Sequence, residues 1–73
     1  MIQYGAVLFY TTSSAMRAEK LLTKAGYAVK LIPTPREFSS DCGIALRFAW
    51  DQYEQVKSIL DTAHVDIDTM HRM

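Results

Sequence analysis

The run Ala6-Val7-Leu8-Phe9-Tyr10 constrains the fold of this chain most, because no charged residue interrupts it. A strand with one face in water alternates apolar and polar residues, whereas an unbroken apolar run is typical of a strand buried on both faces. We therefore expect a strand over residues 6–10 in the interior of a sheet. It is the longest apolar run in the chain, and it is far too short to cross a membrane.

A helix and a second strand are predicted after this run. Thr11–Ser14 offers several N-cap side chains, and Gly26 stands where the glycine that follows a helix belongs. Between them, apolar residues recur at helical spacing, at Ala15, Ala18, Leu22 and Ala25. Residues 28–32 then alternate around Lys30 and stop at Pro33, as an edge strand does.

The second half of the chain predicts a strand, a helix and a last strand. One face of the third strand is shared by Cys42, Ile44, Leu46 and Phe48. Asp51, followed three residues later by Glu54, resembles a capping box. The helix that it opens carries an apolar stripe of Tyr53, Val56, Leu60 and Ala63, and Trp50 and Tyr53 are expected in the core. Residues 65–68 alternate apolar and acidic side chains, as a half-exposed strand does.

The predicted order β-α-β-β-α-β is that of the ferredoxin-like fold, an α+β architecture with both helices on one face of a four-stranded antiparallel sheet. Its common strand order, 4-1-3-2, places the first strand inside and the Lys30 strand at an edge. We expect one domain over residues 1–73. Because such a sheet leaves one face uncovered and the first strand is apolar on both faces, we also expect an apolar patch and a homo-oligomer that buries it.

Composition excludes several classes of function. Eight basic and eight acidic side chains give a formal net charge of zero, and no cluster of lysines and arginines favours nucleic acid. The chain has no pattern of a secretory signal, and no membrane association is expected. Its single cysteine cannot form an internal disulfide and needs no oxidising compartment. A cytoplasmic protein is therefore expected.

The segment Pro33–Gly43 is the candidate functional site, because it holds the only cysteine, both prolines and a glycine directly behind the thiol. A thiol reacts as thiolate, which needs electropositive surroundings. Arg36, the hydroxyls of Ser39 and Ser40, and the backbone N–H groups of residues 40–43 can form a small anion nest, whereas Asp41 opposes it. The alternatives stay open: Cys42 as a small buried apolar residue, Arg36 in a surface ion pair, and the serines in ordinary turns.

Neither histidine lies near the cysteine in the sequence. His64 and His71 flank the predicted last strand, so we expect a solvated histidine at a helix end and another in the tail. Two histidines and one cysteine form no zinc-binding spacing, and a Cys/His nucleophilic pair is not supported. We expect Asp66 and Asp68 to lie on the solvated face of the last strand. The sequence thus predicts no metal and no cofactor.

The arrangement Thr34-Pro35-Arg36 … Ser39-Ser40-Asp41-Cys42-Gly43-Ile44-Ala45-Leu46, after a helix that contains Arg17–Leu22, resembles the selenium/sulfur carrier protein-like family of small bacterial and archaeal proteins. The similarity extends from Val7 to about Leu60, with Phe38 where a smaller aliphatic residue is expected. The resemblance implies a role in handling sulfur or selenium, with Cys42 as the carrying residue. It also implies sulfur or selenium donor and acceptor proteins as partners.

Two functions are therefore weighed. A thiol carrier needs an exposed, activated thiol and a docking surface, but no substrate pocket and no general base. The alternative is a non-catalytic binding or regulatory module whose Pro33–Gly43 loop holds a small anion or a partner protein, with Cys42 as packing. Under either function, we expect a carrier or binding protein more than a stand-alone enzyme. Exposure of the Cys42 sulfur distinguishes the two.

Overall fold

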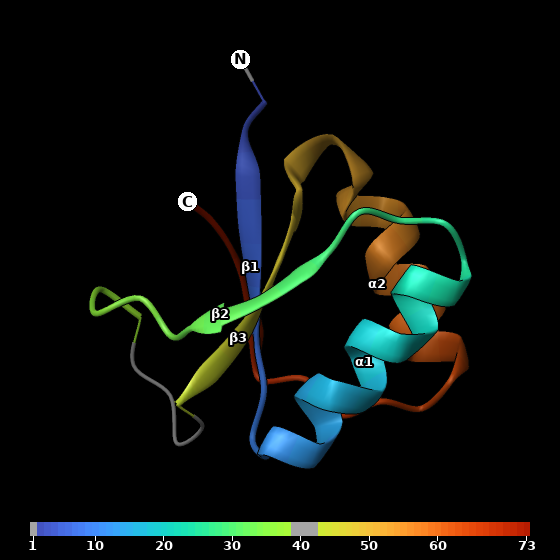
Figure 1. The fold of residues 1–73 in the computed structure, drawn as a ribbon, viewed down its shortest axis with the longest axis horizontal. Coiled ribbons are helices and arrows are strands. Elements are labelled where there is room, and N and C mark those ends of the chain that lie inside the picture. Colours follow the sequence, from blue (N-terminus) through green and yellow to red (C-terminus); the bar gives the residue numbers. More distant parts are fainter. Residues whose placement is uncertain (1, 39–42) are drawn as a thin grey trace.

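The computed structural model describes residues 2–38 and 43–73. The elements are β1 (Tyr4–Leu8), α1 (Thr12–Lys24), β2 (Lys30–Pro33), β3 (Ile44–Ala49), the short 3-10 helix η1 (Trp50–Gln52), α2 (Tyr53–Thr62) and β4 (Thr69–Arg72). The strands form one antiparallel sheet in the order β2-β3-β1-β4, and both helices lie on the same side of it (Figure 1). The ferredoxin-like fold and its strand order, with β1 inside and Lys30 on an edge strand, are confirmed.

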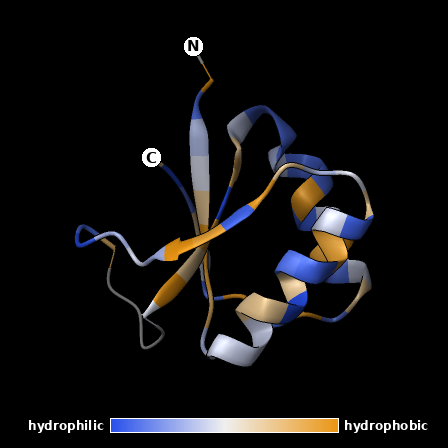
Figure 2. Ribbon diagram, in the orientation of Figure 1, coloured by the Kyte–Doolittle hydropathy of each residue, from blue (hydrophilic) through white to orange (hydrophobic). Residues whose placement is uncertain are grey.

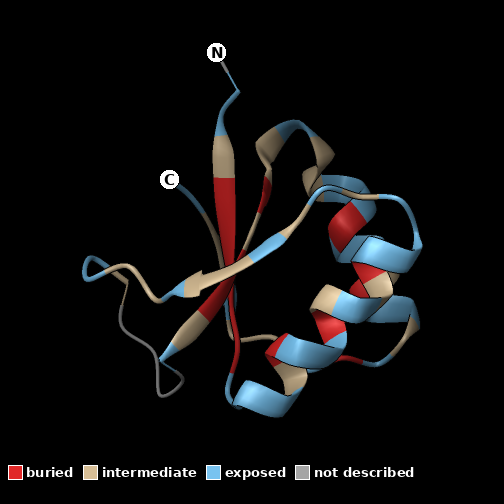
Figure 3. Ribbon diagram, in the orientation of Figure 1, coloured by how far each residue is buried: buried red, intermediate tan, exposed pale blue. Residues whose placement is uncertain are grey.

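The main core lies between the sheet and the two helices. Fully buried side chains meet there from β1, β3, α1 and α2, among them Val7, Leu22, Leu46, Phe48 and Leu60. Figure 2 shows apolar residues along the strands and hydrophilic ones on the outward turns of the helices, and Figure 3 shows the inner strands as the most buried part. Burial of each such leucine or phenylalanine contributes about 1.5–3 kcal/mol.

β1 begins and ends two residues earlier than the apolar run predicts. It spans Tyr4–Leu8, after which Phe9 is still buried in the main core while Tyr10 is 55% exposed. The start of the strand requires a glycine. A Cβ on Gly5 would lie 2.5 Å from Cε3 of Trp50 and 2.6 Å from Cζ of Phe48. Gly5 therefore lets these two aromatic rings pack directly against the backbone of β1.

Both ends of α1 form as predicted. The Thr11 hydroxyl caps the first turn by accepting a hydrogen bond of 3.1 Å from the backbone N–H of Ser14. At the other end, Gly26 has a φ of 93°, and its N–H and that of Tyr27 donate to the carbonyls of Thr23 and Leu22. These two bonds are those of a Schellman motif, which favours glycine at the left-handed position.

The start of α2 differs from the prediction. β3 is followed directly by η1. The N–H of Trp50, the first residue of η1, donates to the carbonyl of Gln3 at 2.8 Å and so extends the pairing with β1 beyond the end of the strand. α2 then begins at Tyr53, with Gln52 at the N-cap and no side-chain cap. The capping box headed by Asp51 is therefore wrong. The expected core packing of Trp50 is confirmed, because its half-buried ring stands between Phe48 and Tyr53, at centroid distances of 5.8 and 5.0 Å.

The last strand lies further along the chain than predicted. α2 ends in a second Schellman arrangement, in which the N–H of His64 donates to Asp61 and that of Val65 to Leu60. Val65 is consequently buried in the main core as part of the helix end. Pairing with β1 starts only at the N–H of Asp68, which donates to the Leu8 carbonyl at 2.7 Å, and β4 covers Thr69–Arg72. The prediction of a strand over 65–68, with two aspartates on its open face, is therefore wrong.

The face of the sheet away from the helices is partly covered. Ala6, Leu8 and Ala45 are buried there, and Ile32 and Phe38 pack against them. The predicted exposure of apolar β1 side chains is wrong, because the segment after β2 folds back so that Phe38 lies over this face. Self-association remains a prediction, but an exposed apolar face of the sheet no longer supports it.

Candidate functional site in the β2–β3 loop

The loop that contains the cysteine is closed at its base by the ends of β2 and β3. Pro33 stands opposite Ile44 in the register, and the N–H of Thr34 donates to the carbonyl of Gly43 at 3.1 Å. A turn follows, in which the N–H of Phe38 donates to the Pro35 carbonyl at 3.0 Å. The described first part of the loop, residues 34–38, extends from the end of the sheet on the side away from the helices (Figure 1).

Phe38 attaches this loop to the far edge of the sheet. Its ring stacks on that of His71 in β4, with centroids 4.3 Å apart and an interplanar angle of 11°. The His71 ring is held in turn by Thr69, whose Oγ1 lies 2.7 Å from Nε2. A segment that starts at β2 thus contacts the opposite edge strand, β4.

The two histidines therefore differ in their surroundings. His64 is exposed at the end of α2, as predicted. The expectation of a solvated tail histidine is wrong for His71, which is half-buried, belongs to β4 and contacts the cysteine loop through Phe38. Sequence reasoning missed both Phe38 and His71 as site residues. The only available signal was the aromatic side chain at position 38, where a smaller residue is expected.

The remaining site residues can be placed in part. Arg36 is exposed at the turn. Gly43 is exposed as well, and a Cβ built on it would meet no atom of the described residues within 4 Å. Its φ is not in the left-handed region, so its backbone does not require glycine. Ser39, Ser40, Asp41 and Cys42 lie outside the described residues. The predicted anion nest and the exposure of the thiol therefore remain predictions.

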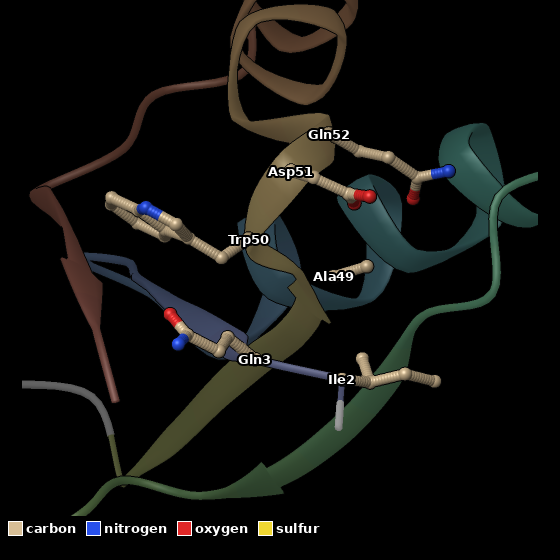
Figure 4. Close-up of a pocket in the computed structure, with 6 residues that line it drawn as sticks. All are labelled: Ile2, Gln3, Ala49, Trp50, Asp51 and Gln52. Atoms are coloured by element: carbon tan, nitrogen blue, oxygen red, sulfur yellow. The ribbon is translucent and has the colours of Figure 1, made fainter.

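A hollow of about 520 Å³ lies at the other end of the central strands, away from this loop. It is lined by Ile2, Gln3, Ala49, Trp50, Asp51 and Gln52. Trp50 and Gln3 extend to one side of the strand end and Asp51 and Gln52 to the other, so the polar groups do not converge on a common point (Figure 4). Asp51 is the only titratable side chain among the lining residues, and we assign no chemistry to this hollow.

The described residues also offer no metal site and no membrane-spanning helix. Within residues 2–38 and 43–73, no three histidine, cysteine or carboxylate side chains are grouped so that they could hold a metal ion. No helix in the described part of the chain is long and apolar enough to cross a membrane.

The fold and the loop together define a small α+β protein that carries its only cysteine between the second and third strands of a ferredoxin-like sheet. A family model described as "Putative Se/S carrier protein-like" matches residues 4–72, nearly the whole chain. The chain belongs to this family, as the resemblance of its loop indicated. No curated protein and no solved structure shows a significant match.

Proposed function

We propose that the protein carries sulfur or selenium on Cys42 between a donor and an acceptor protein. The observation that carries this proposal is the family match over residues 4–72, in a chain whose only cysteine stands in the β2–β3 loop. The family name gives the cargo, and a single cysteine leaves one side chain that can hold it covalently.

Loading is a thiol exchange in which the thiolate of Cys42 attacks the outer sulfur of a persulfide on the donor. A bond forms between these two sulfurs, the donor's own sulfur–sulfur bond breaks, and the donor thiolate leaves with the electron pair. Cys42 then bears the persulfide. The transferred sulfur keeps its oxidation state, so the step needs no oxidant. Delivery is the same step with an acceptor thiolate as the attacking group, and selenium would move in the same way.

The geometry around the loop supports such a role. Phe38 is fixed on His71 at one side of residues 39–42, and the carbonyl of Gly43 is bonded to Thr34 at the other. Both flanks of the segment are therefore held before a partner arrives, which reduces the ordering that transfer requires. In this proposal Arg36, Ser39 and Ser40 stabilise the thiolate, with Asp41 opposing them.

Mass spectrometry of the intact protein tests the proposal. After incubation with a cysteine desulfurase and cysteine, we expect a mass increase of one sulfur atom that reductant removes. Cys42→Ser, treated identically, should show none. An unchanged mass in the native protein, or the same adduct on Cys42→Ser, would exclude Cys42 as the carrier.

A further inference from the structure

The charges of the protein are unevenly distributed between its layers, although their sum is zero. The four strands contain no aspartate or glutamate, and their ionisable side chains are Lys30, Arg47, His71 and Arg72, with the phenol of Tyr4. The acidic residues of the described part lie elsewhere. Glu19, Asp51, Glu54 and Asp61 lie on helices, and Glu37, Asp66 and Asp68 lie in connecting segments.

Two of the cations stand side by side on the face away from the helices. The register places Lys30 opposite Arg47, and Arg47 opposite Ala6, which belongs to the buried cluster on that face. Ala6 is in turn opposite His71. Like charges directly opposite each other destabilise a sheet. Since the strands offer no carboxylate to offset this repulsion, the pair is suited to a negative group supplied from outside.

The surroundings of this pair indicate what kind of group fits. The Arg47 guanidinium carbon lies 4.3 Å above the ring centroid of Tyr4. Stacking on a ring orients a guanidinium and leaves its N–H edge available to a carboxylate. A hollow of about 320 Å³ lies beside it, lined by Ile2, Tyr4, Ala28, Val29, Lys30, Arg47 and Ala49. Cations and apolar side chains thus share one surface, and arginine and tyrosine are enriched where proteins bind each other.

We propose that this face, defined by Tyr4, Lys30, Arg47 and the hollow beside them, is a docking surface for an acidic segment of a partner protein. A carboxylate of the segment lies between Lys30 and Arg47, and a neighbouring apolar side chain enters the hollow. Nucleic acid fits less well, because so few cations neutralise few phosphates and do not use the apolar lining. Phe38 packs against the cluster that contains Ala6 on the same face, so the docking surface and the start of the segment that leads to Cys42 share this face of the sheet.

The proposal goes beyond the proposed function, because it does not depend on Cys42. It is tested by titrating the ¹⁵N-labelled protein with a short peptide that alternates glutamate and leucine, and with the same peptide carrying glutamine. The glutamate peptide should shift the amide signals of Tyr4, Lys30 and Arg47, and the glutamine peptide should not. Lys30→Gln should weaken the response. Lys57→Gln, which removes another exposed cation, on α2, should leave it unchanged.

Several results would overturn the proposal. They are equal shifts with the glutamine peptide, shifts outside this face or none at all, and equal sensitivity to Lys30→Gln and Lys57→Gln. Equal shifts from sodium acetate at the same carboxylate concentration would indicate a site for a small anion instead. Tighter binding of a short single-stranded DNA would indicate a nucleic-acid surface. Lys30 is exposed, so its replacement tests the proposal even if changes at Arg47 disturb folding.

Discussion

Phe38 connects the candidate site to the rest of the molecule. Its ring stacks on His71 and packs against a cluster that includes Ala6 and Leu8. One side chain therefore both covers the second face of the sheet and holds the loop that leads to Cys42. The aromatic residue suits this position because a flat apolar ring can stack on an imidazole and also pack against alanine and leucine side chains.

Phe38→Ala should lower the free energy of unfolding by about 1–2 kcal/mol, since it removes a half-buried ring and uncovers apolar side chains of β1. Urea denaturation measures this change. Phe38→Leu is the matched control, because it keeps apolar volume and loses only the stacking, so its effect should be smaller. Equal stability of native protein and Phe38→Ala would show that the ring contributes nothing to the fold.

The sequence alone identified the loop as the candidate site, but not the contact through which Phe38 fixes the loop to the sheet. Cys42, Arg36 and Gly43 are recognised because they are close together along the chain and follow a family pattern. The contact of Phe38 with His71 joins residues far apart in sequence, and no local pattern predicts it. It depends on β2 and β4 lying at opposite edges of the sheet, with Phe38 reaching from the end of β2 to β4.

Among the elements, the ends of the helices explain where the prediction succeeded and where it failed. Gly26 marks the end of α1 because glycine adopts a positive φ readily. His64 takes the same place after α2 with a φ of 56°, and nothing in the sequence marks it as a helix end. Residues 65–68 could therefore be misread as a strand, since alternation over so few residues does not distinguish a strand from a helix end.

His64→Gly should stabilise the protein by up to about 1 kcal/mol. The left-handed conformation costs an L-residue about 1–2 kcal/mol, and the greater freedom of glycine in the unfolded chain offsets part of this gain. Thermal unfolding measures the change as a rise in melting temperature. His64→Ala is the control, since it removes the imidazole and keeps the unfavourable φ, and it should not stabilise. Equal stabilisation by both changes would contradict this explanation.

Gly5→Ala should destabilise the packing of β1 against β3 and η1 by about 1–3 kcal/mol. The added methyl group would lie 2.5 Å from Trp50 and 2.6 Å from Phe48, whose ring is fully buried and cannot move aside without disturbing the core. Gly43→Ala is the matched control, because its methyl group would meet no atom of residues 2–38 and 43–73 within 4 Å, and we expect a change within about 0.5 kcal/mol. Denaturation curves of the two variants that coincide would refute the argument from close packing.

For the whole molecule, the order of elements and the buried first strand were sufficient to predict the fold. They fix which strands lie inside, and the arrangement follows from short connections. The covering of the second face could not be predicted in this way. It depends on a loop that folds back on the sheet, and the pattern of β1 alone is compatible with coverage by a loop, a second copy or a partner.

Self-association remains a prediction that now rests on the small size of the chain and on the edges of β2 and β4, along which a second copy could pair. Light scattering at high micromolar concentration should then give the mass of a dimer. The mass of a monomer at that concentration would rule it out.

The central claim is that Cys42 is an accessible, activated thiol, and the rate of its alkylation tests this most directly. Iodoacetamide should modify the native protein near neutral pH faster than it modifies free cysteine, because the thiolate is the reacting form. Arg36→Ala should slow the reaction while leaving the fold unchanged, since Arg36 is exposed. If Cys42 reacts only after denaturant is added, its thiol is buried packing, and the carrier function proposed for this protein is wrong.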